Sequence, residues 1–114
     1  MLPAKNRLNR GQIKEILVRG RSFFSDHLSF RCAPLEAGQS TAFAVVVAAK
    51  WAKKASERNK IKRLIKLVLR NFLPQVKASW GGVIFLKKSL TPVTLRGLET
   101  EVKQLISQTP LFYK

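Results

Sequence analysis

The hydrophobic residues near the N-terminus have the spacing of a helix. Three of them recur at helical intervals, namely Ile13, Ile16 and Leu17. Asn9 is followed three residues later by Gln12, as in an N-cap with its capping partner, and Gly20 supplies a stop. This pattern predicts a short first helix from Arg10 to Arg19.

Two later segments are dominated by β-branched and aromatic residues and predict strands at 23–32 and 41–49. Turn-forming residues between them, including Pro34 and Gly38, favour an antiparallel pair. The second segment contains the run AFAVVVAA, which lacks polar alternation. That strand is therefore expected to be buried on both faces.

A long basic segment, KWAKKASERNKIKRLIKLVLR, follows from Lys50 to Arg70, and its helical pattern ends at Pro74. On a helical wheel one arc is apolar and comprises Ile61, Leu64, Ile65, Val68, Leu69 and Phe72. The next arc is polar and mostly basic, and comprises Arg58, Asn59, Lys62, Arg63, Lys66 and Arg70. One side of this helix should pack on a sheet, while the other presents a cationic stripe to solvent.

The remaining pattern predicts one more strand and one more helix. VIFL at 83–86 follows Gly81-Gly82, which is interpreted as a turn entering the strand. Thr91-Pro92 then opens a helix with a single apolar stripe formed by Leu95, Leu98, Val102, Leu105 and Ile106.

The predicted order is αββαβα, with a strand on either side of the central helix. This order implies an α+β fold of one domain, a two-layer sandwich in which a small sheet is covered by helices. The basic helix is then the crossover between two strands. The domain is expected to span residues 1–114, with 1–6 and 109–114 as flexible ends.

The charge is strongly unbalanced, with 22 Lys and Arg against 6 Asp and Glu, which gives +16 on 114 residues. Such a charge opposes compactness but raises the affinity for polyanions. Most charged helix faces are merely solvated, yet those faces mix signs, and here Glu57 is the only acid between Lys50 and Arg70. Contact with RNA or DNA is therefore favoured over an inert face.

The sequence gives little support for a catalytic site or a metal site in this chain. The six acids are scattered over different predicted elements, whereas a two-metal nuclease site needs clustered carboxylates. His27 has no obvious acidic or nucleophilic partner in the sequence. Cys32 is alone, which excludes an internal disulfide and Cys-based zinc sites. We therefore expect a nucleic-acid-binding protein with no catalytic residue and no metal site of its own.

Targeting signals are also missing from the sequence. The longest apolar run, Phe43 to Ala49, is far shorter than the ~20 residues of a membrane span, and no signal peptide opens the chain. A cytoplasmic protein is expected, with neither a membrane nor a small-molecule substrate as partner.

The run KKASERNKIKRLIKLVLR resembles the RNR signature of the bacterial ribonuclease P protein subunit, in which an Ala precedes Arg-Asn-Arg and Lys-Arg-Leu. The matching positions are Ala55, Arg58, Asn59, Ile61, Lys62, Arg63 and Leu64, while Lys60 and Lys66 replace arginines with the charge kept. The N-terminal KNRLNRGQIKEILVRGRS is also similar to the opening of that family. The resemblance covers about Lys5 to Ile106.

The resemblance implies a subunit of a ribonucleoprotein endonuclease that removes the 5′ leader of precursor tRNA, with catalysis by the RNA and its bound Mg²⁺. It also implies a left-handed βαβ crossover, as in the ribosomal protein S5 domain 2-like fold, against the general rule. The residues expected at the catalytic RNA are Lys50, Lys53, Lys54, Arg58, Asn59, Lys60, Lys62, Arg63, Lys66 and Arg70. Those expected in a leader-binding cleft between the first helix and the sheet are Ile13, Leu17, Phe30 and Arg31.

The sequence departs from the family around that cleft. Ile13 and Leu17 stand where Phe is usual, and Arg31 stands where Tyr is frequent. From periodicity alone, Ile13 and Leu17 fit the core of the first helix almost as well as a leader contact. Trp51 fits either packing against the core or stacking on a nucleotide. The alternative to a ribonuclease P subunit is a general basic RNA-binding or ribosome-associated protein without a role in cleavage.

Overall fold

The structure, a computed structural model, describes residues 6–73, 79–90 and 92–109, with the backbone alone for residues 92–95. Its elements are α1 (Arg10–Arg19), β1 (Arg21–Phe24), β2 (Leu28–Pro34), β3 (Ala42–Val46), α2 (Ala55–Phe72), β4 (Trp80–Leu86) and α3 (Pro92–Ser107). The predicted α+β class and single domain are confirmed, and the bounds of α1 are those predicted. Asn9 and Gln12 form the expected capping box at its N-terminus.

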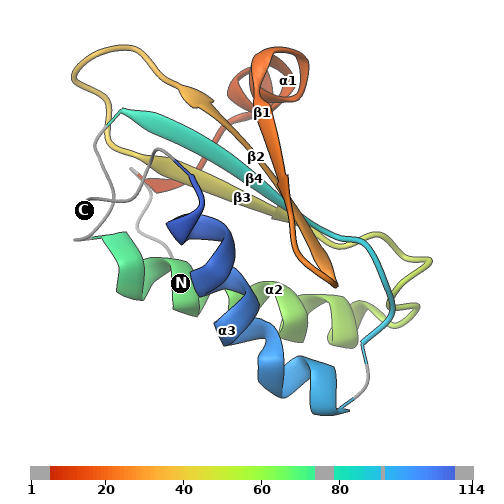
Figure 1. Cartoon of the computed structure of the whole chain (residues 1–114). Helices are drawn as coiled ribbons and strands as arrows, with labels where there is room; N and C mark the ends of the chain where they lie inside the picture. The colour runs from red at the N-terminus through yellow and green to blue at the C-terminus, as the bar shows by residue number, and fades with distance from the viewer. Residues whose placement is uncertain (1–5, 74–78, 91, 110–114) are drawn as a thin grey trace.

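The four strands form one mixed sheet in the order β1-β2-β4-β3 (Figure 1). β1 pairs with β2 and β2 with β4 in antiparallel fashion, whereas β3 and β4 are parallel. α2 connects these two parallel strands, so the predicted βαβ crossover is present; its hand stays a prediction. α1 lies on one face of the sheet, and α2 and α3 lie across the other face.

Two predictions about the strands were wrong. The predicted strand 23–32 is a hairpin, because the chain turns between Ser25 and His27 and the N–H of Ser25 donates to the carbonyl of Leu28 at 2.9 Å. The order is therefore αβββαβα. The predicted antiparallel pairing of 23–32 with 41–49 is also absent, because β4 lies between β2 and β3 and pairs with both.

Gly81 and Gly82 lie inside β4 rather than in the predicted turn. A Cβ atom on Gly82 would lie 2.4 Å from ring atoms of Phe30, the neighbouring side chain on β2. Glycine is therefore needed here to let the Phe30 ring cover the backbone.

The main core lies between the sheet and the pair α2 and α3. From α2 it takes the predicted apolar arc, with Ile65 and Leu69 fully buried and Leu64 packed at its margin. From α3 it takes four fully buried residues, Leu98, Val102, Leu105 and Ile106. The predicted apolar stripes of both helices are confirmed, apart from Leu95, whose side chain lies outside the described residues.

A smaller core lies on the opposite face, where Ile16 of α1 packs with Ala33 and Val83. β3 is thus enclosed over most of its length, although Val46 at its end is 37 % exposed. The expectation that the segment 41–49 is buried on both faces therefore fails at Val46, and also at Ala48 and Ala49, which are exposed and follow the strand.

The two chain ends are partly described. Asn6 is buried and its side chain donates to the carbonyl of Thr41 at 2.6 Å, and buried Thr109 donates to the carbonyl of Ile106 at 2.7 Å. Both residues thus make a hydrogen bond within the folded domain. The expected flexibility of 1–6 and 109–114 stays a prediction, and 1–5 and 110–114 lie outside the described residues. In the part of the chain that is described, no helix is long and apolar enough to cross a membrane.

Candidate RNA-binding surfaces

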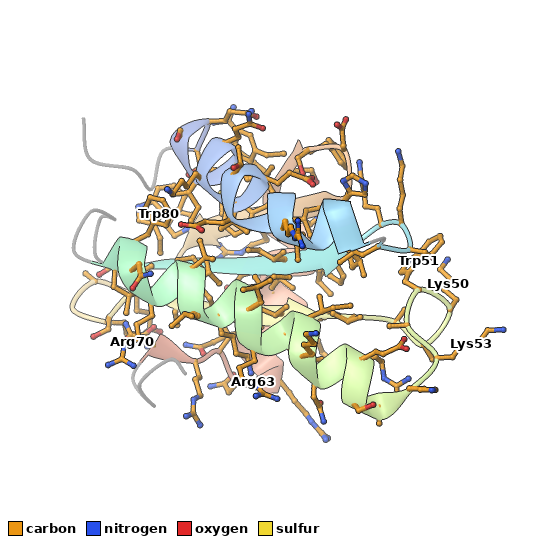
Figure 2. The ribbon with its side chains drawn as sticks, turned by 90° about the horizontal axis from the view of Figure 1, so that it is seen from below. Lys50, Trp51, Lys53, Arg63, Arg70 and Trp80 are labelled. Atoms are coloured by element: carbon orange, nitrogen blue, oxygen red, sulfur yellow. The ribbon has the colours of Figure 1, made fainter. Side chains whose placement is uncertain are left out.

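The polar arc of α2 forms a cationic stripe on the solvent side of the helix. Arg63 and Arg70 point away from α3 and the core (Figure 2). Asn59 and Lys60 are exposed as well, whereas Lys62 and Lys66 are half-buried. From Asn59 to Arg70 the stripe extends over roughly 16 Å, given a rise of about 1.5 Å per residue.

The cations of this stripe are not neutralised within the described residues. The three ion pairs found there lie elsewhere, namely Arg19 with Glu15, His27 with Glu101, and Lys103 with Glu99. Glu57, the one acid of α2, lies in the first turn, where the helix dipole favours a negative charge. The stripe is therefore a surface that a polyphosphate would stabilise by relieving repulsion among its charges.

Residues 47–54, called loop 47–54 below, extend the cationic surface beyond the N-terminus of α2. Lys50, Lys53 and Lys54 are exposed, and Figure 2 shows Lys50 and Lys53 at the N-terminal end of the helix. Lys54 is the N-cap residue and offers no side-chain cap. A lysine side chain has no acceptor for the free backbone N–H groups at a helix N-terminus. Lys54 therefore adds charge at this position but does not stabilise the helix as a capping residue would.

Arg58 has a structural role that the sequence did not reveal. Its Nη1 donates to the carbonyls of Ala52 and Lys53, each at 2.9 Å. The half-buried guanidinium thus ties the first turn of α2 to loop 47–54 and orients the backbone that carries Lys53. Arg58 therefore lies at the predicted surface, but its donors hold the loop.

Trp51 takes one of the two roles left open by the sequence, packing against the core, while stacking on a nucleotide stays a prediction. It is half-buried and packs against the main core. Lys50 Nζ lies 4.7 Å from the centroid of its ring, a cation–π contact. Packing holds Trp51 in place, and the ring in turn holds Lys50 beside α2.

The four residues predicted for a leader cleft do not share one surface. Ile13 and Leu17 are half-buried on α1, and Ile13 packs against the smaller core. Arg31 lies on the same side of the sheet, donates through Nε to Ser22 Oγ at 2.9 Å, and donates through Nη1 to the carbonyl of Leu17. Arg31 therefore bridges the sheet to the last turn of α1.

Phe30 is placed wrongly by the prediction. It is 0 % exposed and lies in the main core, where its ring is 6.4 Å from that of Phe43. Successive side chains of a strand alternate between faces, so Phe30 and Arg31 point to opposite sides of the sheet. Phe30 is a core residue and does not line the side that carries α1.

Comparison with known proteins places the chain in a family. A sequence model described as Ribonuclease P matches residues 2–109. The chain belongs to the ribonuclease P protein family. It is 31 % identical to the ribonuclease P protein component of Picosynechococcus sp., over 98 % of this chain and 97 % of that protein. It is 28 % identical to the component from Microcystis aeruginosa, over 98 % and 97 %.

Solved ribonuclease P proteins share the fold. The protein from Staphylococcus aureus superposes with a TM-score of 0.81 at 14 % identity, covering 97 % of this chain and 100 % of that one. The protein from Thermotoga maritima gives 0.68 at 20 % identity, covering 90 % and 93 %. A protein of this family is one component of a ribonucleoprotein endoribonuclease whose RNA carries out the cleavage.

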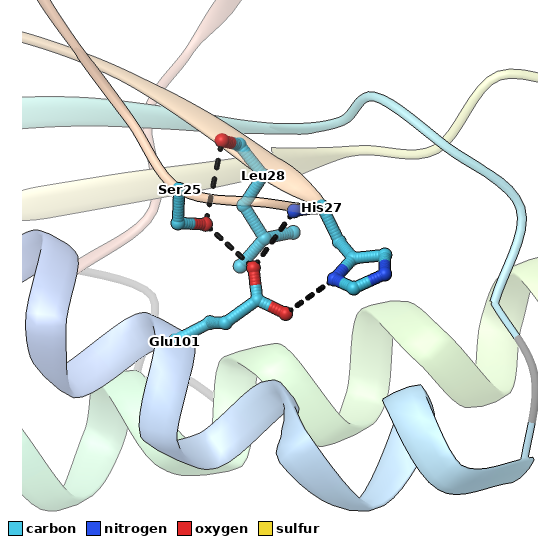
Figure 3. A network of polar contacts seen from close by, with 4 residues as sticks. All are labelled: Ser25, His27, Leu28 and Glu101. Atoms are coloured by element: carbon cyan, nitrogen blue, oxygen red, sulfur yellow. Dashed lines mark hydrogen bonds and ion pairs between the residues drawn. The ribbon is translucent and has the colours of Figure 1, made fainter.

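A Ser–His–Glu group has no signal in the sequence, because Glu101 on α3 lies far along the chain from Ser25 and His27. Glu101 on α3 accepts from Ser25 Oγ at 2.6 Å and from the His27 N–H at 2.8 Å, and its other oxygen lies 2.7 Å from His27 Nδ1 (Figure 3). The expectation that His27 has no acidic partner was therefore wrong. Residues 27 and 101 are 74 positions apart, so no local pattern signals the pair.

The geometry of this group is that of a clamp. The hydroxyl of Ser25 and the ring of His27 both bind the carboxylate of Glu101, and this arrangement gives the serine a carboxylate partner rather than a histidine base. Burial is the largest influence and raises the pKa of Glu101, but hydrogen bonds from Ser25 and His27 and the charge of His27 together leave that pKa lowered. The clamp fastens the β1–β2 turn to α3.

The remaining candidate groups are the Cys32 thiol and side chains that could hold a metal ion. Cys32 is buried, and burial raises the pKa of its thiol to about 11 despite the opposing charge of Arg21. Its thiolate is therefore scarce near neutral pH. No cluster of His, Cys, Asp or Glu suited to a metal ion occurs among the described residues.

The role of Arg58 predicts that its shape matters as well as its charge. Arg58→Lys keeps the charge but loses the forked donors, so loop 47–54 should loosen and the free energy of unfolding should fall by about 1 to 2 kcal/mol. Urea unfolding measures this loss, and titration with ribonuclease P RNA should show weaker binding. Arg63→Lys is the matched control, because Arg63 is exposed. Equal stability and equal RNA affinity in the two variants would contradict the assigned role.

The clamp predicts a specific pH dependence of stability. Because the pKa of Glu101 is lowered from its ordinary 4.5 on folding, the clamp stabilises the protein above about that pH and loses its effect as the pH falls through the lower folded value. Glu101→Gln should reduce the free energy of unfolding at pH 7 by roughly 1 to 3 kcal/mol, with a difference from the unmodified protein that shrinks below pH ~4.5.

Urea unfolding between pH 3 and pH 7 measures that difference. Glu99→Gln is the control, since Glu99 lies on the same helix with its side chain 60 % exposed and should change little. A constant difference across this range for Glu101→Gln would show that the carboxylate charge is not involved.

Proposed function

We propose that this chain holds the catalytic RNA of ribonuclease P on the cationic surface formed by α2 and loop 47–54. The single observation that carries the proposal is this surface, in which exposed Lys and Arg side chains share one side of a helix whose other side is anchored in the core. Phosphates are the groups that such a surface binds, and RNA binding would relieve its self-repulsion. Its members are Lys50, Lys53, Lys54, Asn59, Lys60, Lys62, Arg63, Lys66 and Arg70, with Arg58 as the residue that positions the loop.

The second part of the proposal concerns the substrate. The 5′ leader of precursor tRNA would bind on the sheet face that carries α1, on the far side of the sheet from α2. This separation supports simultaneous contact with both RNAs. Mg²⁺ would act through the RNA component, and the complex would work in the cytoplasm.

Reconstitution is the direct test of the function. The protein is added to a bacterial ribonuclease P RNA at a low Mg²⁺ concentration, and cleavage of precursor tRNA at the 5′ end of the mature sequence is measured. We expect the protein to restore cleavage under conditions in which the RNA alone is inactive. Tight ribosome binding without any stimulation of cleavage would instead support a general RNA-binding role.

The cationic surface predicts a steep dependence of RNA binding on salt. If about five phosphates are neutralised, log K should fall against log[salt] with a slope of about −3.5 to −4.5. Lys66→Ala should reduce the magnitude of that slope by about one. Filter binding to ribonuclease P RNA at several salt concentrations gives both slopes.

Lys103→Ala is the control for this measurement. It removes the same charge from α3, where Lys103 pairs with Glu99 at 3.4 Å, and should leave the slope unchanged. An affinity independent of salt, or equal slopes for all three proteins, would show that α2 does not bind phosphates.

A further inference from the structure

Phe24 is an aromatic residue that the fold leaves in solvent. Its side chain is 62 % exposed at the end of β1, an edge strand of the sheet. Phe23, its neighbour, points to the other face and packs against the main core. The hairpin therefore uses one of two adjacent phenylalanines for the core and exposes the other on the side of α1.

The register places Phe24 in a row that crosses all four strands. Phe24 lies opposite Ser29, Ser29 opposite Phe85, and Phe85 opposite Val46. Side chains at paired positions share one face of a sheet, so this row forms a continuous band. It is called the open band below and comprises Phe24, Ser29, Phe85 and Val46.

α1 covers the neighbouring part of the same face, where Phe85 packs at the margin of the smaller core, and leaves Phe24 and Val46 exposed. Ile16 packs on Ala33, which follows Ser29 on β2, and on Val83, which precedes Phe85 on β4. Val46 is 37 % exposed, and Ser29 and Phe85 are half-buried. The small side chain of Ser29 separates two phenylalanines whose strands lie about 10 Å apart across the sheet.

Positive charge borders the open band. Lys87 Nζ lies 5.2 Å from the centroid of the Phe24 ring, and half-buried Arg31 is in the adjoining row beside Ser22. Exposed Asp26 in the β1–β2 turn is the nearest acid along the chain, and Glu101 is engaged in the clamp. An aromatic ring with an ammonium group beside it matches a nucleotide, whose base stacks and whose phosphate pairs with the cation.

We propose that the open band, together with Lys87, binds single-stranded RNA by stacking an unpaired base on Phe24. This inference rests on the proposed function in naming the strand, which is the 5′ leader of precursor tRNA. Aromatic stacking requires an unpaired base, and the bases of a duplex are already stacked on each other. Phe24 thereby supplies, from the sheet edge, the flat aromatic surface that Ile13 and Leu17 do not offer on α1.

The test uses the reconstituted enzyme and compares the dissociation constants of precursor and mature tRNA. Phe24→Ala should reduce the preference for the precursor at least about fivefold, the factor that corresponds to the ~1 kcal/mol lower bound for one stacked base. Phe24→Leu should lose most of the same preference, because it keeps apolar bulk without a flat ring, and Phe24→Trp should retain it. Val18→Ala is the control, since Val18 is 85 % exposed on α1 and lies outside the band.

A second measurement reports stacking itself. A leader that carries 2-aminopurine should lose fluorescence on binding to the unmodified enzyme and regain it with Phe24→Ala. The inference is overturned if the unmodified enzyme prefers the precursor and Phe24→Ala leaves both the preference and the quenching unchanged.

Failure of the proposed function gives a different result. In that case the unmodified enzyme shows no preference for the precursor, and the full chain alone is titrated with a short single-stranded RNA containing 2-aminopurine. Quenching that depends on Phe24 still supports the open band as a site for single-stranded RNA. Equal quenching with Phe24→Ala rejects it.

Discussion

Parallel strands cannot be joined by a tight turn, so the chain between β3 and β4 has to return along the sheet before the second strand begins. It returns as α2, and this crossover fixes which side of the helix meets the core. Ile65 and Leu69 are fully buried against the sheet and α3. The opposite side of the helix is thereby held outward, and it carries exposed Arg63 and Arg70.

The apolar residues that stabilise α2 and the cations that it exposes thus lie on different sides of the helix. Burial of the apolar arc offsets the repulsion among the cations, which have no acidic partners on α2 beyond Glu57. Arg58 also positions loop 47–54, because its guanidinium donates hydrogen bonds to two carbonyls of the loop. A charged surface held by these contacts would lower the entropic cost of binding RNA.

Local signals made the helices predictable. The capping box of Asn9 and Gln12 sets the start of α1, and periodicity alone divides α2 into its buried and cationic sides.

The pairing of the strands is harder to predict from the sequence, because it depends on contacts between distant segments. The composition around Ser25–His27 predicts one continuous strand, in which Phe24 and Phe30 would share a face. The hairpin puts them on opposite sides of the sheet, so Phe30 enters the core and Phe24 reaches solvent. The contact of His27 with Glu101 likewise joins the β1–β2 turn to α3 and leaves no local trace in the sequence.

We propose that RNA lies against the outward side of α2. Because Cys32 is buried and its pKa is raised to about 11, a cysteine introduced at the surface can be labelled selectively. A benzophenone attached to Arg63→Cys and, in a separate protein, to Lys103→Cys would report which helix is near RNA in the reconstituted enzyme. Photo-crosslinking should join position 63 to the ribonuclease P RNA in high yield and position 103 in little or none. Equal yields from the two positions, or a higher yield from position 103, would contradict the account.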